Sequence, residues 1–197
     1  MHRDSPSHRV ARMLPQPRQL AALGTVLCLY RSRQRAALAG WTRAVRAEWT
    51  AGLDSDGMRE SLWFYDRDDV LCWRLYLLPD SEFMAWDRLS RTLPTRVEAE
   101  FDGGLCQRLW RRLADQLSGD SWYACPLRLH ALDASAGPDP AASSVLAASL
   151  VQPSTVGVAV AGRIAAGEGA SGVAFGTDGC DLDAMAPATT ATFITGT

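Results

Sequence analysis

The sequence predicts an α+β fold, in which an antiparallel sheet with hairpins packs against helices. Strand-like apolar runs follow one another through short links, two segments carry helical periodicity, and no regular β-α-β alternation occurs. The 197 residues suffice for one domain. We expect a disordered arm over 1–13, the domain over 14–168, and a flexible tail rich in Gly, Ala and Thr over 169–197.

Proline and glycine mark the first elements of the expected domain. Pro17 can open a short helix that Gly24 closes. The β-branched and aliphatic run TVLCLYR (25–31) then predicts a strand. Residues 41–50 are ambiguous between strand and helix.

The clearest signal is a hairpin over residues 61–78. Its two apolar runs, SLWFYD and VLCWRLYLL, are separated by a turn-rich Arg-Asp-Asp link. Side chains alternate between the two faces of a strand. The second run therefore divides into one set on one face, Leu71, Trp73, Leu75 and Leu77, and another set on the opposite face, Cys72, Arg74, Tyr76 and Leu78.

Helical and strand signals alternate along the rest of the chain. Ser81 is the expected N-cap of a helix that ends at Pro94, with an apolar stripe formed by Phe83, Trp86, Leu89 and Leu93. A second amphipathic helix is predicted over 104–117, and a strand over 121–132. We expect an Ala-rich helix over 143–167, broken near Pro153.

Charge and cysteine content narrow the class of protein. The net charge is −2, and all 20 basic residues are arginines, seven of them within residues 1–35. No basic face continues into the body of the chain, so we expect a solvated arm and no nucleic-acid partner. No apolar run approaches the ~20 residues of a membrane span, and no secretory signal occurs. Five widely spaced cysteines suit neither a disulfide framework nor a zinc site, so we expect a cytoplasmic protein.

His130 is the one histidine within the expected domain, and it shares a strand face with Arg128. Motifs for phosphate binding, dinucleotide binding and hydrolysis are absent from the sequence. His130 is either an ordinary half-exposed strand residue or a ligand to a metal or haem iron. Cys125, which precedes Pro126, is the alternative candidate for a haem ligand.

Aromatic residues are abundant, with seven Trp and four Tyr, and several of them crowd the hairpin. They form either a packed sheet face or a broad apolar wall for a flat aromatic ligand, with Trp73 among them. Arginines could bind the carboxylates of such a ligand through bidentate hydrogen bonds, or could simply be solvated. The candidates are Arg31, Arg43, Arg46 and Arg74.

Two segments, LGTVLCLYRSR and ESLWFYDRDDVLCWRLYLLPDSEFMAWDRL, carry motifs of a known family. The first resembles the opening of a repeat of the HemS/HmuS-type hemin-transport and haem-degrading proteins, and the second resembles the signature hairpin of that family with the helix that follows. Arg43 stands six residues before Trp49, as in the family, and ACPLRLHAL resembles the family strand whose histidine binds haem iron. That match falls on His130. The family's His-Lys pair is replaced by Trp73 and Arg74, and the chain corresponds to one half-length unit.

The resemblance implies a cytoplasmic protein that binds haem b and takes part in haem uptake, trafficking or iron acquisition. His130 would be the iron ligand, and Arg43 and Arg31 would be propionate partners, with Arg43 the first candidate for the distal side. Partners would be haem itself and a haem-import transporter or haem acceptor. A homodimer would restore the two-repeat arrangement. Alternatives are an interaction module that has lost haem, and a haem-degrading monooxygenase; the departures favour a non-enzymatic role.

Overall fold

The computed structural model describes residues 14–34, 36–54, 57–96, 121–133, 144–170 and 173. The expected arm over 1–13, the expected helix over 104–117 and most of the expected tail lie outside the described residues. The elements in chain order are α1 (Pro17–Ala21), β1 (Gly24–Arg31), the 3₁₀ turn η1 (Ser32–Gln34), α2 (Ala39–Arg43), β2 (Arg46–Asp54), β3 (Gly57–Tyr65), β4 (Leu71–Ser81), α3 (Phe83–Ser90), β5 (Trp122–Asp133), β6 (Ser144–Leu150) and α5 (Thr155–Gly167).

The six strands form a single antiparallel sheet in the order β2-β3-β4-β1-β5-β6, which confirms the α+β prediction. β1 lies in the middle, between β4 and β5, and was correctly predicted from its β-branched and aliphatic sequence. β2 and β6 are the two edge strands. The predicted hairpin is β3–β4, and its turn contains Asp69 with a φ of 63°.

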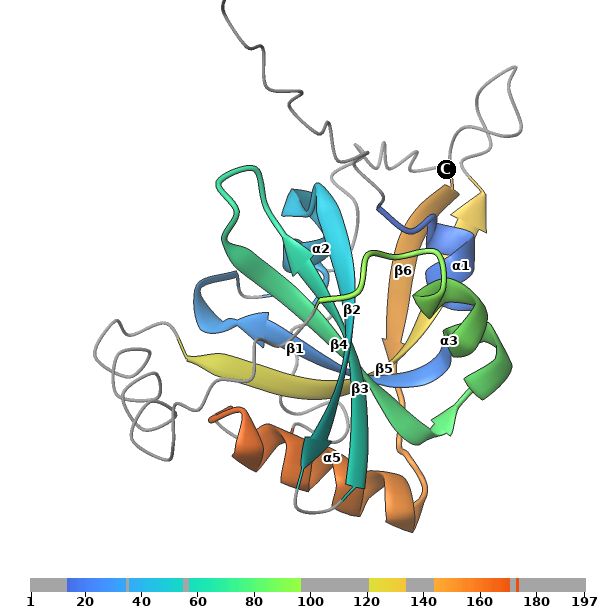
Figure 1. Ribbon diagram of the computed structural model, residues 1–197, viewed down its shortest axis with the longest axis vertical. Coiled ribbons are helices and arrows are strands. Elements are labelled where there is room, and N and C mark those ends of the chain that lie inside the picture. The colour runs from blue at the N-terminus through green and yellow to red at the C-terminus, as the bar shows by residue number, and fades with distance from the viewer. Residues whose placement is uncertain are drawn as a thin grey trace, which may run out of the picture.

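Each face of the sheet carries its own apolar cluster. One face, here named the three-helix face, packs against residues of α1, α2 and α3, including Leu20, Trp41 and Trp86. The opposite face, here named the α5 face, packs against Ala161, Ile164 and Ala165 of α5. In Figure 1, α5 runs along the lower side of the sheet, apart from α1 and α2. The α5 face is the smaller of the two clusters.

The alternation predicted for β4 is confirmed over most of the strand. Trp73, Leu75 and Leu77 face the three helices, whereas Tyr76 and Leu78 face α5. Leu71 and Cys72 depart from the prediction, because Leu71 packs with the α5-face cluster and Cys72 with the three-helix-face cluster. A register shift between β3 and β4 at this end of the hairpin accounts for the change of side.

Two helix predictions are wrong. Residues 144–150 form strand β6 rather than the first half of a helix, because they pair along their whole length with β5. Ser81 ends β4 and does not cap α3; its hydroxyl accepts from the Leu78 amide and donates to the Thr25 carbonyl. Phe83 is 56% exposed and lies outside the buried stripe that Trp86 and Leu89 form.

The structure defines the ambiguous segment 41–50 and the first part of the expected tail. Residues 41–50 divide between the end of α2 and the start of β2, with the change at residues 44–45. Ala170 and Val173, within the expected tail, pack against the α5-face cluster. Val173 also forms a parallel bridge with Ala124 of β5. The described fold therefore extends a few residues beyond 168.

Candidate functional site

β5 presents His130 on the α5 face of the sheet, as the alternation predicted. Leu127 and Leu129 are fully buried in the three-helix-face cluster. Arg128 is exposed and His130 is half-buried on the opposite side of the strand. β5 extends beyond its last paired residue with β1, Arg128, so at His130 the described sheet consists of β5 and β6.

Three cross-strand pairs surround His130 and form a small surface, here named the His130 platform. The pairs are Arg128 with Ser149, His130 with Ala147, and Leu132 with Val145. The Nε2 atom of His130 lies 2.8 Å from the Ser149 hydroxyl, and the tautomer of the ring decides which group donates. Leu132 is 52% exposed and Val145 is 37% exposed, so the platform combines an imidazole, a cation and exposed apolar side chains.

Trp73 and Cys125 lie on the other face of the sheet, within the core. Trp73 has no exposed surface, and its indole Nε1–H donates to the Ala37 carbonyl (2.7 Å) and lies 2.9 Å from Cys28 Sγ. Cys125 also has no exposed surface and stands directly opposite Cys28 in the β1–β5 register. A ligand bound on the His130 platform would not contact either residue.

Arg43 ends α2 and binds the β3–β4 turn. Its Nη2 atom donates to Asp66 Oδ2 at 2.9 Å, while Asp66 Oδ1 accepts from the amides of Asp68 and Val70. The Arg43 side chain is 58% exposed and the Asp66 side chain 7% exposed. This pair has a clear structural role, because it links α2 to the turn of the hairpin.

Arg31 and Arg74 belong to a row of alternating arginines and tryptophans that crosses the α5 face. Arg74 Cζ lies 4.3 Å from the ring centre of Trp63 and 4.6 Å from that of Trp122. Arg31 lies over the same Trp122 ring at 4.0 Å, and Arg96 lies over Trp63 at 4.4 Å. We name these five residues the arginine–tryptophan row; they come from β1, β3, β4, β5 and the segment after α3.

The charge at the centre of this row is compensated within the protein. Arg74 is buried, and its Nη1 atom donates to Glu168 at the end of α5 and to the Tyr76 hydroxyl (3.4 Å). Burial lowers the pKa of Arg74, but Tyr76 and Glu168 outweigh it, so the pKa is raised overall. Burial also raises the pKa of Tyr76 above its usual value. Both groups therefore keep their protons at neutral pH.

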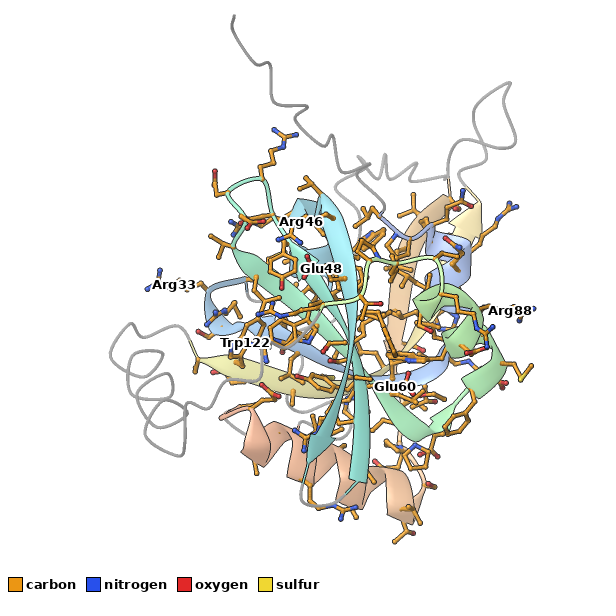
Figure 2. All side chains as sticks on the ribbon, viewed as in Figure 1. Arg33, Arg46, Glu48, Glu60, Arg88 and Trp122 are labelled. Atoms are coloured by element: carbon orange, nitrogen blue, oxygen red, sulfur yellow. The ribbon has the colours of Figure 1, made fainter. Side chains whose placement is uncertain are left out.

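Tyr65 and Arg46 extend the row toward the β2 edge of the sheet. Arg46 lies 3.8 Å over the Tyr65 ring, and Arg96 donates to the Tyr65 hydroxyl. Arg46 forms ion pairs with Glu48 and Asp69. Figure 2 shows Arg46 beside Glu48, with Trp122 farther along the same side of the sheet. The aromatic positions 63 and 65 indicated a crowded hairpin face, but nothing in the sequence paired them with Arg96 or Arg46.

The residues predicted to hold one ligand occupy separate places. Trp122 and His130 lie eight residues apart on the same strand face, which corresponds to roughly 26 Å at the rise of a β-strand. This span exceeds the reach of a haem from its iron to its propionates. Arg31 and Arg74, which contact Trp122, could not therefore bind the propionates of a haem whose iron is held by His130.

His130 fits an axial haem ligand on its own chemistry. It is half-buried, and within the described residues the hydrogen-bond partner of its Nε2 atom is the Ser149 hydroxyl, which an iron ion could displace. Among the described residues, no group of three or more His, Cys, Asp or Glu side chains could hold a metal ion.

Two further findings bear on the class of protein. No helix in the described segments is long and apolar enough to cross a bilayer. Comparisons of the chain with protein-family models, with curated proteins and with solved structures give no match.

Proposed function

We propose that this protein binds haem b on the His130 platform and that His130 is the axial ligand to the iron. The position of the imidazole supports the proposal: it stands half-buried on the α5 face of the sheet, between a cation and two exposed apolar residues. A porphyrin lying across this face would cover Leu132 and Val145, and burial of apolar surface is the main source of affinity for a flat apolar ligand.

Arg128 is the proposed partner for a propionate. It lies on the same face of β5 as His130, two residues earlier, and its side chain is exposed. An arginine can bind a carboxylate through two parallel hydrogen bonds. Among the described residues the platform walls one side of the ligand, which suits a protein that receives haem from an import transporter and passes it to an acceptor in the cytoplasm.

The second candidate is an interaction module that does not bind haem. It is favoured by the dispersal of the predicted ligand set, because Trp73 and Cys125 are core residues and Arg43 and Arg74 have carboxylate partners. The haem-degrading alternative receives no comparable support from the described residues, and we do not favour it.

Titration of the purified protein with hemin tests the proposal. We expect a saturable shift of the Soret band with one haem per chain, loss of that shift in His130→Ala, and its partial recovery when free imidazole is added. Cys125→Ala and the distant exposed variant Arg88→Ala should titrate like the parent chain; Figure 2 shows Arg88 pointing outward from the side of α3.

The alternatives predict different results. A parent chain with no saturable Soret shift would favour the interaction module. An unchanged spectrum and affinity in His130→Ala would remove His130 as the ligand. Conversion of bound haem to a linear tetrapyrrole on addition of a reductant and oxygen would favour the monooxygenase.

A further inference from the structure

Strand β6 is an edge strand without the features that usually keep edges from pairing. Its sequence, SVLAASL, contains no charged residue and no proline, and its seven pairs with β5 run without a bulge. Natural edge strands commonly carry charges, prolines or bulges, because exposed backbone groups otherwise form hydrogen bonds with another chain. β6 therefore lacks the ordinary protection against edge-to-edge association.

The outer side of β6 carries a regular set of backbone groups that pair with no described strand. The Val151 amide donates to the Pro126 carbonyl, and this bond sets the alternation, so Val145, Ala147 and Ser149 direct their amides and carbonyls toward β5. Leu146, Ala148 and the two terminal residues of β6 direct theirs outward. No backbone hydrogen bond from another described segment reaches the outward groups of Leu146 and Ala148.

The opposite edge strand of the sheet, β2, is protected against pairing, unlike β6. At β2 the Trp49 amide donates to the Pro94 carbonyl, and the Trp49 carbonyl accepts from the Arg96 amide. A short parallel bridge between Trp49 and Thr95 covers this edge. β2 also carries charged side chains, among them Arg46 and Glu48. Within the described residues, the fold thus blocks the β2 edge and leaves the β6 edge unpaired.

We propose that β6 pairs antiparallel with β6 of a second copy, which joins the two sheets across a twofold axis at Ala147. This register sets Ser144 opposite Leu150 of the other copy and Leu146 opposite its Ala148, so every outward-facing residue of β6 takes part. Leu146, Ala148 and Leu150 belong to or pack against the three-helix-face cluster, and the pairing would continue that cluster from one copy to the next.

The proposed twofold axis passes through Ala147, where the side chain of β6 is small. Ala147 would face Ala147 of the other copy as a non-hydrogen-bonded pair, in which the Cα atoms are about 4.5 Å apart. Two methyl groups fit this spacing without displacement of the backbone. The two His130 residues would stand on the same face, on either side of the axis, roughly 14 Å apart at three strand spacings. The pairing itself does not depend on haem.

Charge substitutions at the axis test the register. In Ala147→Arg and in Ala147→Glu, like charges stand directly opposite one another, so we expect the dissociation constant of the dimer to rise about tenfold or more. An equal mixture of the two variants should associate again, because the charges then differ. Leu132→Arg adds the same charge one strand inward on the same face and should associate like the parent chain. Sedimentation velocity over a concentration series measures each constant.

Amide hydrogen exchange gives a second measurement that needs no substitution. The amides of Leu146 and Ala148 should become protected as protein concentration rises, whereas the Ala147 amide, already bonded to β5, should not change. A parent chain that stays monomeric at every concentration overturns the proposal. Dimers with unprotected Leu146 and Ala148 amides, or Ala147 variants that dimerise as tightly as the parent chain, also overturn it.

Discussion

Arg74 of β4 forms an ion pair with Glu168, which follows the last turn of α5 and anchors this helix to the sheet. Both side chains are largely buried, with exposed fractions of 9% and 24%. Arg59 of β3 approaches the same carboxylate at 3.8 Å. Glu168 is therefore the described carboxylate that compensates the charge at the centre of the arginine–tryptophan row.

Removal of the Glu168 carboxylate should destabilise the fold clearly. Glu168→Ala leaves the guanidinium of Arg74 buried without its anion, and we expect the free energy of unfolding to fall by about 2 kcal/mol. Asp87→Ala, which breaks the exposed Asp87–Arg91 pair, is the matched control and should cost less than about 0.5 kcal/mol. Urea denaturation of the two variants measures the difference. Equal losses in the free energy of unfolding would show that the buried pair stabilises the fold no more than the exposed pair.

Glu60 accepts hydrogen bonds from two tryptophans of different elements, and its removal should weaken the packing of both. Its Oε2 atom accepts from the indole of Trp49 on β2 (3.2 Å) and from the indole of Trp86 on α3 (2.9 Å). Glu60→Ala leaves both indole N–H groups without this acceptor, and we expect a loss of about 2 kcal/mol in the free energy of unfolding. Glu60→Gln keeps one acceptor oxygen and should lose less.

Thermal and urea unfolding followed by tryptophan fluorescence check the Glu60 variants. The emission of the folded Glu60→Ala protein should also shift to the red, because Trp49 and Trp86 lose a shared polar anchor and gain mobility. A Glu60→Gln variant as unstable as Glu60→Ala would mean that the negative charge, rather than the oxygen acceptor, is what the two indoles require.

Two glycines in helices should respond to alanine in opposite directions. A Cβ atom at Gly40 would lie 2.5 Å from the Cys72 carbonyl oxygen and 2.7 Å from Trp73 Cβ, so Gly40→Ala must push α2 away from β4. We expect it to cost about 2 kcal/mol. A Cβ at Gly162 meets nothing within 4 Å, and Gly162→Ala should stabilise α5 by about 0.5–1 kcal/mol. Denaturation midpoints show whether each variant is more or less stable than the parent chain. A Gly40→Ala variant with unchanged stability would contradict the close contact of α2 with the sheet.

Stability should fall at alkaline pH in part through Cys72. Burial raises the pKa of the Cys72 thiol from 9.0 to about 11. In the unfolded chain the thiol loses its proton at lower pH than in the folded protein. The contribution of Cys72 is therefore fully present below about pH 9 and is lost as pH rises through about 11. The full effect is about 3 kcal/mol.

Comparison with Cys72→Ala isolates this contribution. The free energy of unfolding of the variant should decline less steeply between pH 9 and pH 11 than that of the parent chain. Tyr76 remains in both proteins and contributes equally to the remaining slope, since burial raises its pKa as well. Identical slopes in the two proteins would show that the Cys72 thiol titrates normally in the folded state.

Local sequence patterns predicted the central part of the sheet well. The β-branched run of β1, the turn-rich link between β3 and β4, and the alternation of β5 depend on neighbours in the chain, and the structure confirms all three. Alternation was enough to place Arg128 and His130 on one face and Leu127 and Leu129 on the other.

The same patterns failed where a distant partner determines the structure. Alanine and serine have no preference for strands, so SVLAASL indicated a helix, and pairing with β5 overrides that preference. Ser81 has the chemistry of an N-cap, but its hydroxyl bonds to Thr25 of β1 and Leu78 of β4 instead. Arg43, Arg31 and Arg74 were grouped as partners of one ligand, whereas the structure places Arg31 and Arg74 beside Trp122 and Arg43 against the β3–β4 turn.

The order of apolar and polar residues along the chain by itself established the α+β class, the hairpin and the faces on which most strand residues lie, because side-chain periodicity follows from the local geometry of the backbone. Only the tertiary structure decided that Arg74 meets Glu168, that Trp63 and Trp122 flank one arginine, and that β6 ends the sheet. Backbone hydrogen bonds are the same for every residue, so strand order and register depend on how the whole chain packs and not on any local pattern.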